Sequence, residues 1–100
     1  MRLTEHEKQV ITAAIHRFDP DANIWLFGSR IDDRGRGGDI DLAVLSSHIH
    51  RKEIHAIRHE ICQHIGEQKI DLVIAPNRNH PMLAVAIENG VPLVEKNAIR

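Results

Sequence analysis

The stretch from Leu26 to Leu45, LFGSRIDDRGRGGDIDLAVL, decides how the fold is interpreted. A short apolar run over residues 23–27 leads into a glycine, and its length and its isoleucine and aromatic content favour a buried strand. The run over residues 39–45, DIDLAVL, predicts a second strand. Because side chains alternate along a strand, Asp39 and Asp41 share one of its faces.

Two carboxylates on one face of an otherwise apolar strand need a physical explanation. They repel each other, and they lose hydration when the strand packs into a sheet. A divalent cation such as Mg²⁺ removes both penalties, because it binds carboxylate oxygens and leaves room for substrate phosphates. Taken alone, an Asp-x-Asp pair is more often the solvated face of an edge strand, so its neighbours in the sequence decide its meaning.

A Gly-Ser pair, Gly28 and Ser29, follows the first strand. A glycine there lets the backbone approach a ligand, and the N–H groups of a helix starting there would bind phosphate, with the serine hydroxyl as an additional donor. Arg30 would add positive charge, and Arg34 and Arg36 are weaker phosphate-binding candidates. Taken alone, the pair is an ordinary turn. Neither a Walker A loop nor a dinucleotide-binding glycine fingerprint is present.

The rest of the chain predicts three helices and two further strands. Thr4 and Glu7 have the spacing of a capping box, which opens a helix over 4–18. Isoleucines at helical spacing predict a second helix over 50–65. The remaining elements are expected to be a strand over 69–75, a helix over 80–89 with Pro81 in its first turn, and a strand over 91–94. This order predicts an α+β fold, a mixed α/β sheet with helices packed on it, in a single domain over residues 1–100.

The composition narrows the function classes. A formal charge of −1 excludes a strongly basic nucleic-acid binder, and an aromatic content of 3% leaves little surface for stacking bases, so no direct nucleic-acid binding is expected. No run approaches the ~18 apolar residues that a membrane span requires, and the charged N-terminus does not resemble a secretory signal. The single cysteine permits no internal disulfide and fits a reducing compartment. A cytoplasmic protein is expected.

The Gly28-Ser29 pair, a nine-residue spacer and Asp39-Ile40-Asp41 together resemble the DNA polymerase β-like nucleotidyltransferases. More narrowly, the pattern is similar to that of the minimal nucleotidyltransferases. The spacer is one residue shorter than their commonest form, a difference that loop variation absorbs. The resemblance extends over nearly the whole chain, including the leading helix and the closing ENGVPLVEK, and it implies a polymerase β-like nucleotidyltransferase fold.

The resemblance also implies a role for each motif residue. Asp71, in KIDLVIA, occupies the position of a third carboxylate on a later strand. Asp39, Asp41 and Asp71 would be the catalytic and metal-binding residues. They would hold two Mg²⁺ ions about 3.5–4 Å apart that stabilise the attacking and leaving oxygens. Asp71 would also help to deprotonate the acceptor hydroxyl. Gly28-Ser29 would hold the β- and γ-phosphates of the nucleotide, with Arg30 beside them.

The implied reaction is Mg²⁺-dependent transfer of a nucleoside monophosphate, AMP from ATP, to a hydroxyl. Minimal nucleotidyltransferases are commonly paired with a HEPN-domain protein, which is often an RNase toxin. The resemblance therefore implies an antitoxin that modifies a tyrosine of its HEPN partner within a hetero-oligomer. Two alternatives stay open. The protein would neutralise the partner by covering its active site without chemistry, or, less favoured, it would modify a small molecule such as an aminoglycoside.

The histidines and the cysteine give weaker signals. His55 and His59 stand four residues apart on the predicted second helix, a spacing that can bind zinc. No third ligand is evident, so a solvated helix face is favoured. Cys62 is expected to be a small, partly buried apolar residue. Convergence of the three aspartates requires the strand over 69–75 to pair with the strand over 39–45.

Overall fold

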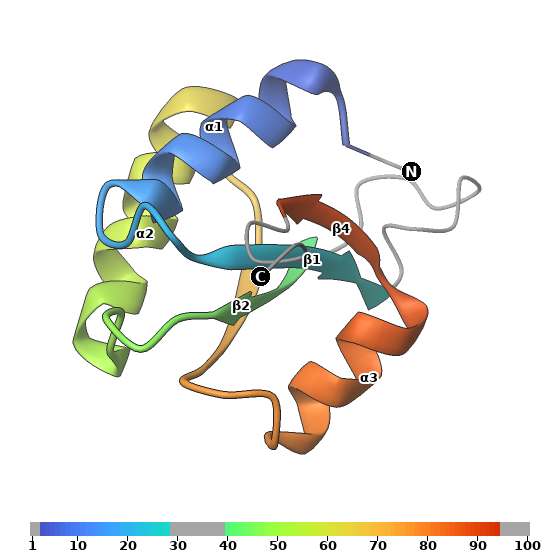
Figure 1. Ribbon diagram of the computed structural model, residues 1–100. Coiled ribbons are helices and arrows are strands. Elements are labelled where there is room, and N and C mark those ends of the chain that lie inside the picture. Colours follow the sequence, from blue (N-terminus) through green and yellow to red (C-terminus); the bar gives the residue numbers. More distant parts are fainter. Residues whose placement is uncertain (1–2, 29–39, 95–100) are drawn as a thin grey trace.

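The computed structural model describes residues 3–28 and 40–94. The elements follow the predicted order, and the ends of each differ from the sequence-based expectation by two residues at most (Figure 1). In chain order they are α1 (Glu5–His16), β1 (Asn23–Phe27), β2 (Ile40–Leu45), α2 (Arg51–Ile65), β3 (Ile70–Ala75), α3 (Pro81–Asn89) and β4 (Val91–Val94). None of these helices is long and apolar enough to cross a bilayer within the described ranges.

The helix starts are set by local sequence. The side chain of Thr4 accepts a hydrogen bond from the Glu7 N–H, and the Glu7 carboxylate accepts one from the Thr4 N–H, both at 3.0 Å, which confirms the predicted capping box of α1. Pro81 opens α3 as predicted, and the Nδ1 atom of His80 accepts a hydrogen bond from the Met82 N–H at 3.1 Å. The capping box and the Pro81 start act over a few residues, so the sequence alone suffices to predict them.

The four strands form one mixed sheet in the order β3-β2-β1-β4. β1 runs antiparallel to β2 and to β4, whereas β2 and β3 are parallel. α2 forms the crossover that a parallel connection requires. This mixed sheet with three helices, within the described residues, confirms the predicted α+β class.

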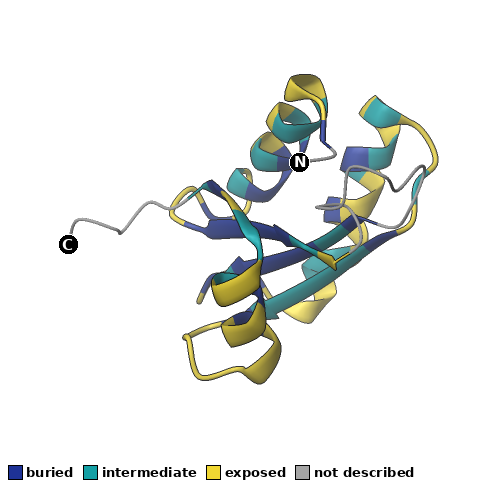
Figure 2. Ribbon diagram, turned by 90° about the vertical axis from the view of Figure 1, so that its right-hand side faces the viewer, coloured by how far each residue is buried: buried dark blue, intermediate teal, exposed yellow. Residues whose placement is uncertain are grey.

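Helices cover both faces of the sheet, as Figure 2 shows from the side. α1 and α2 pack on one face, where the larger core forms around Ile11, Ile15, Ile57 and Ile61. α3 packs on the other face, and it contributes Leu83 and Ala86 to a smaller core; its strand partners are Trp25, Ala43 and Ala75. The sheet is therefore buried more completely on the α1–α2 face than on the α3 face, which leaves part of the α3 face for other roles.

Candidate active site

The end of β1 and the beginnings of β2 and β3 meet at one end of the sheet. Asp41 of β2 is in register with Phe27 of β1 on one side and with Asp71 of β3 on the other. The predicted requirement that the strand of Asp71 neighbours the strand of Asp41 is therefore met. Adjacent strands lie about 4.8 Å apart, so two carboxylates in register are close neighbours.

Both aspartates lie on the α3 face of the sheet. Ile40 and Leu42, which flank Asp41, are buried in the core beneath α1 and α2. Asp41 consequently points to the opposite face, and Asp71 follows the same alternation on β3. Both side chains are half-buried. Like charges directly opposite each other on neighbouring strands destabilise a sheet, so this pair is costly unless a cation accompanies it.

Gly28 closes this end of the sheet beside Asp41. Its φ is +81°, a left-handed conformation that L side chains rarely adopt. A Cβ atom added at Gly28 would collide with the carboxylate of Asp41. From the sequence alone, close approach of a ligand to the backbone accounts for this glycine. The structure adds a second reason, because the absent side chain leaves the space that the Asp41 carboxylate occupies.

The two described aspartates fit part of a magnesium site. Hard carboxylate oxygens are the ligands that Mg²⁺ prefers, and this ion binds through one or two carboxylates together with substrate phosphates. Within residues 3–28 and 40–94 no group of three His, Cys, Asp or Glu side chains is placed to hold a metal. Asp39, the third predicted ligand, lies outside the described residues, as do Ser29, Arg30, Arg34 and Arg36.

Lys69 is a residue of this end of the sheet that the sequence analysis did not single out. It precedes Asp71 by two residues, and its carbonyl accepts a hydrogen bond from the Ile40 N–H at 3.0 Å. Lys69 and Asp71 stand two residues apart in the sequence, as Asp39 and Asp41 do. This spacing could have indicated Lys69 from the sequence alone. Lys69 is exposed, and it adds a positive charge to the segment that leads into β3.

The cavity at the opposite end of β1 and β2 is separate from the carboxylate pair. It has a volume of about 420 Å³ and is lined by Asp21, Asn23, Ser46 and Arg78, among others. The guanidinium of Arg78 stacks over the ring of buried Trp25, 5.7 Å from its centroid. Trp25 also packs with Leu83 and Ala86 in the smaller core, so it is a packing residue of the α3 face.

The two histidines and the cysteine that the sequence singled out agree with their simpler interpretations, a solvated helix face and a partly buried apolar residue. His55 and His59 are exposed on α2. Cys62 is partly buried against the larger core, and its thiol donates to the carbonyl of Gln68 at 3.4 Å. The partly buried, apolar role predicted for Cys62 is confirmed.

Comparison with known proteins gives one informative result. No curated protein matches the chain. The family model described as "Polymerase beta, Nucleotidyltransferase" matches residues 8–99. The matched segment includes Gly28, Asp41 and Asp71 together with each strand of the sheet described above. Proteins of this family generally use a nucleoside triphosphate and a divalent metal. Because the match spans nearly the whole chain and the small α+β fold agrees with it, the chain belongs to the polymerase β nucleotidyltransferase family.

Proposed function

We propose that this protein is a Mg²⁺-dependent adenylyltransferase that transfers AMP from ATP to a tyrosine hydroxyl of a HEPN-domain toxin, and so acts as its cytoplasmic antitoxin. General nucleotidyl transfer follows from the family. The catalytic part of the proposal is carried by one observation, the register of Asp41 with Asp71 beside Gly28. The choice of partner is supported by the likeness of the Gly28-Ser29 and Asp39-Ile40-Asp41 motifs to the minimal nucleotidyltransferases.

The proposed reaction is an in-line displacement at the α-phosphorus of the nucleotide. The acceptor oxygen forms a bond to this phosphorus while the bond to the departing pyrophosphate breaks. Asp39, Asp41 and Asp71 would hold magnesium, which would supply electrostatic stabilisation of the attacking and the leaving oxygens. Asp71 also takes the proton that leaves the acceptor hydroxyl. The Gly28-Ser29 pair and Arg30 hold the phosphates.

The test is the intact mass of the co-purified HEPN partner before and after incubation with ATP and Mg²⁺. Wild type is expected to add the mass of AMP, and Asp41→Asn is expected to add none, because a neutral amide is a poor ligand for a hard cation. Asp21→Asn is the matched control. It makes the same chemical change at an exposed aspartate near the opposite end of β1, so it is expected to transfer as wild type does.

Two results would contradict the proposal. Full transfer by Asp41→Asn would show that the Asp41 carboxylate is not a required metal ligand. A tightly bound, silenced partner that gains no mass would favour the alternative of a binding antitoxin. In that case a variant carrying both Asp41→Asn and Asp71→Asn would still protect cells from the toxin.

A further inference from the structure

The outer edge of β3 offers main-chain hydrogen-bonding groups. The sheet order places β3 at one edge, with β2 on its inner side. The carbonyl of Lys69 accepts a hydrogen bond from the Ile40 N–H of β2 at 3.0 Å, and that of Ala75 accepts one at 2.9 Å from the N–H of Ser46, the residue after β2. N–H and C=O groups of successive residues alternate between the two sides of a strand, so those of Ile70, Leu72 and Ile74 point to the outer side. In the described ranges no strand pairs with them.

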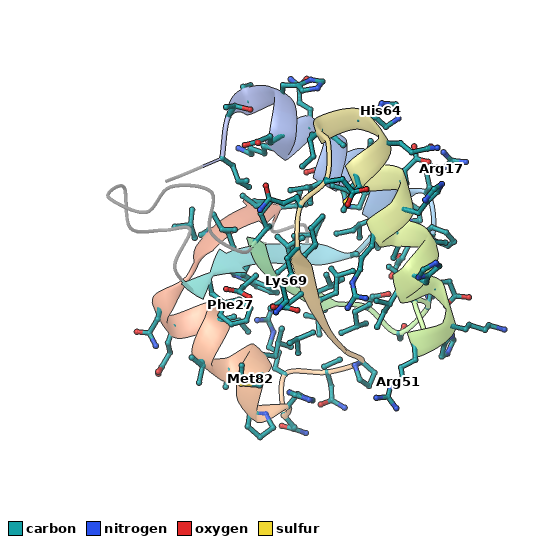
Figure 3. The ribbon with its side chains drawn as sticks, turned by 180° about the vertical axis from the view of Figure 1, so that it is seen from behind. Arg17, Phe27, Arg51, His64, Lys69 and Met82 are labelled. Carbon is teal, nitrogen blue, oxygen red and sulfur yellow. The ribbon has the colours of Figure 1, made fainter. Side chains whose placement is uncertain are left out.

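A groove of about 720 Å³ runs along this edge, between β3 and α2. Ile54, Leu72 and Ile74 contribute apolar surface to it, and all three are partly buried. In Figure 3, β3 lies at the front between α2 and α3, with Lys69 labelled at its start and Arg51 near its other end. A groove with apolar residues beside an open strand edge is the geometry that binds an extended peptide by strand addition.

The groove is positively charged. Arg51 and Arg58 flank Ile54 on one face of α2, since residues three and four apart are neighbours on a helix. Both guanidinium groups are exposed, and neither forms an ion pair within the described part of the chain. His50 and His80 also line the groove, whereas no aspartate or glutamate does. The two arginine charges favour an acidic occupant.

The chemistry of the groove selects among the possible occupants. Single-stranded nucleic acid is held largely by stacking its bases on aromatic rings, and none lines the groove. A second copy of this chain, paired edge to edge, would bring two sets of arginines together, a like-charge contact that is unfavourable. An acidic extended segment of another protein satisfies both the main-chain edge and the guanidinium groups.

We propose that the outer edge of β3, together with the Arg51–Arg58 face of α2, docks an extended acidic segment of a partner protein as an added strand. Asp71 stands on this same strand, between Ile70 and Leu72, whose main-chain N–H and C=O groups point to the outer edge. A segment paired with β3 therefore passes within one strand spacing of Asp71, about 4.8 Å. If the proposed function holds, on which this step rests, the docked segment carries the acceptor hydroxyl to the carboxylate pair of Asp41 and Asp71.

The test measures binding and amide hydrogen exchange without nucleotide. The probe is a synthetic peptide that alternates glutamate and valine and ends in tyrosine; its control replaces each glutamate with lysine. The acidic peptide is expected to slow exchange at the amides of Leu72 and Ile74, and the lysine peptide is not. Arg58→Glu is expected to weaken binding about tenfold, whereas Lys52→Glu, the same charge change at an exposed α2 residue outside the groove, leaves binding unchanged.

Several results would overturn the docking proposal. One is equal binding of the lysine peptide, and another is protection of amides away from β3. Tighter protection of the same amides by a single-stranded RNA would assign the edge to nucleic acid. Their protection by self-association of the free protein would assign it to a second copy. Asp41→Asn is expected to bind the peptide normally and to transfer nothing. Wild-type protein that binds the peptide but transfers no AMP to its HEPN partner would count against the proposed chemistry and not against the docking edge.

Discussion

Gly28 is the residue at which backbone geometry and the carboxylate pair meet. Gly28→Ala is expected to lower the free energy of unfolding by about 1–3 kcal/mol, because alanine is strained at a φ of +81°. It is also expected to abolish nucleotidyl transfer, since the new methyl group would displace the Asp41 carboxylate. Urea unfolding and a transfer assay on the folded variant measure the two effects separately.

Gly66 provides the matched control at the same scale. Its φ is +92°, so Gly66→Ala introduces similar backbone strain, but an added Cβ there has no neighbour within 4 Å. Gly66→Ala is expected to lose stability to a comparable degree and to retain transfer. Equal activity losses in the two variants would show that general destabilisation, not the position of Asp41, accounts for the effect of Gly28→Ala.

At the scale of single elements, the start of α1 depends on the Thr4 cap. Thr4→Ala is expected to cost about 1 kcal/mol, because the N–H of Glu7 loses its side-chain acceptor. In a domain of this size, that corresponds to a fall of about 4–8 °C in Tm. Thermal unfolding monitored by circular dichroism measures it. Thr4→Ser keeps the hydroxyl and is expected to unfold as wild type does; a loss as large as that of Thr4→Ala would disprove the capping role.

At the scale of the whole molecule, a buried hydrogen bond joins segments 27 residues apart. The Ser46 hydroxyl donates to the Asp19 carboxylate at 2.5 Å, and Ser46 Oγ also accepts from the N–H of Ile49 at 3.0 Å. Both side chains are only 5% exposed. Ser46→Ala is expected to cost about 1–3 kcal/mol, because it leaves a buried carboxylate oxygen without its donor.

A double-mutant cycle isolates this contact. Ser46→Ala, Asp19→Ala and the double variant are compared by urea unfolding. The double variant is expected to lose less than the sum of the single losses, by about 0.5–3 kcal/mol, as is typical of directly interacting side chains. Strict additivity would mean that the two residues act independently in holding the β1 and β2 ends together.

The sequence by itself determined the elements and the motif of this protein. Capping, strand alternation and helix periodicity act over a few residues, so the Thr4–Glu7 box, the Pro81 start of α3 and the strand over 91–94 were all predictable. The Gly28-Ser29 and Asp-x-Asp spacing was likewise local. It indicated the family that the match over residues 8–99 then established.

Only the tertiary structure decided which strands are neighbours. Nothing local in KIDLVIA states that it pairs in parallel with β2, in the register that sets Asp71 beside Asp41. The same pairing leaves β3 at the edge of the sheet and opens the groove beside Arg51 and Arg58. Strand order depends on how distant apolar faces pack together, here through the α2 crossover, and that long-range packing is not encoded in any short stretch of the chain.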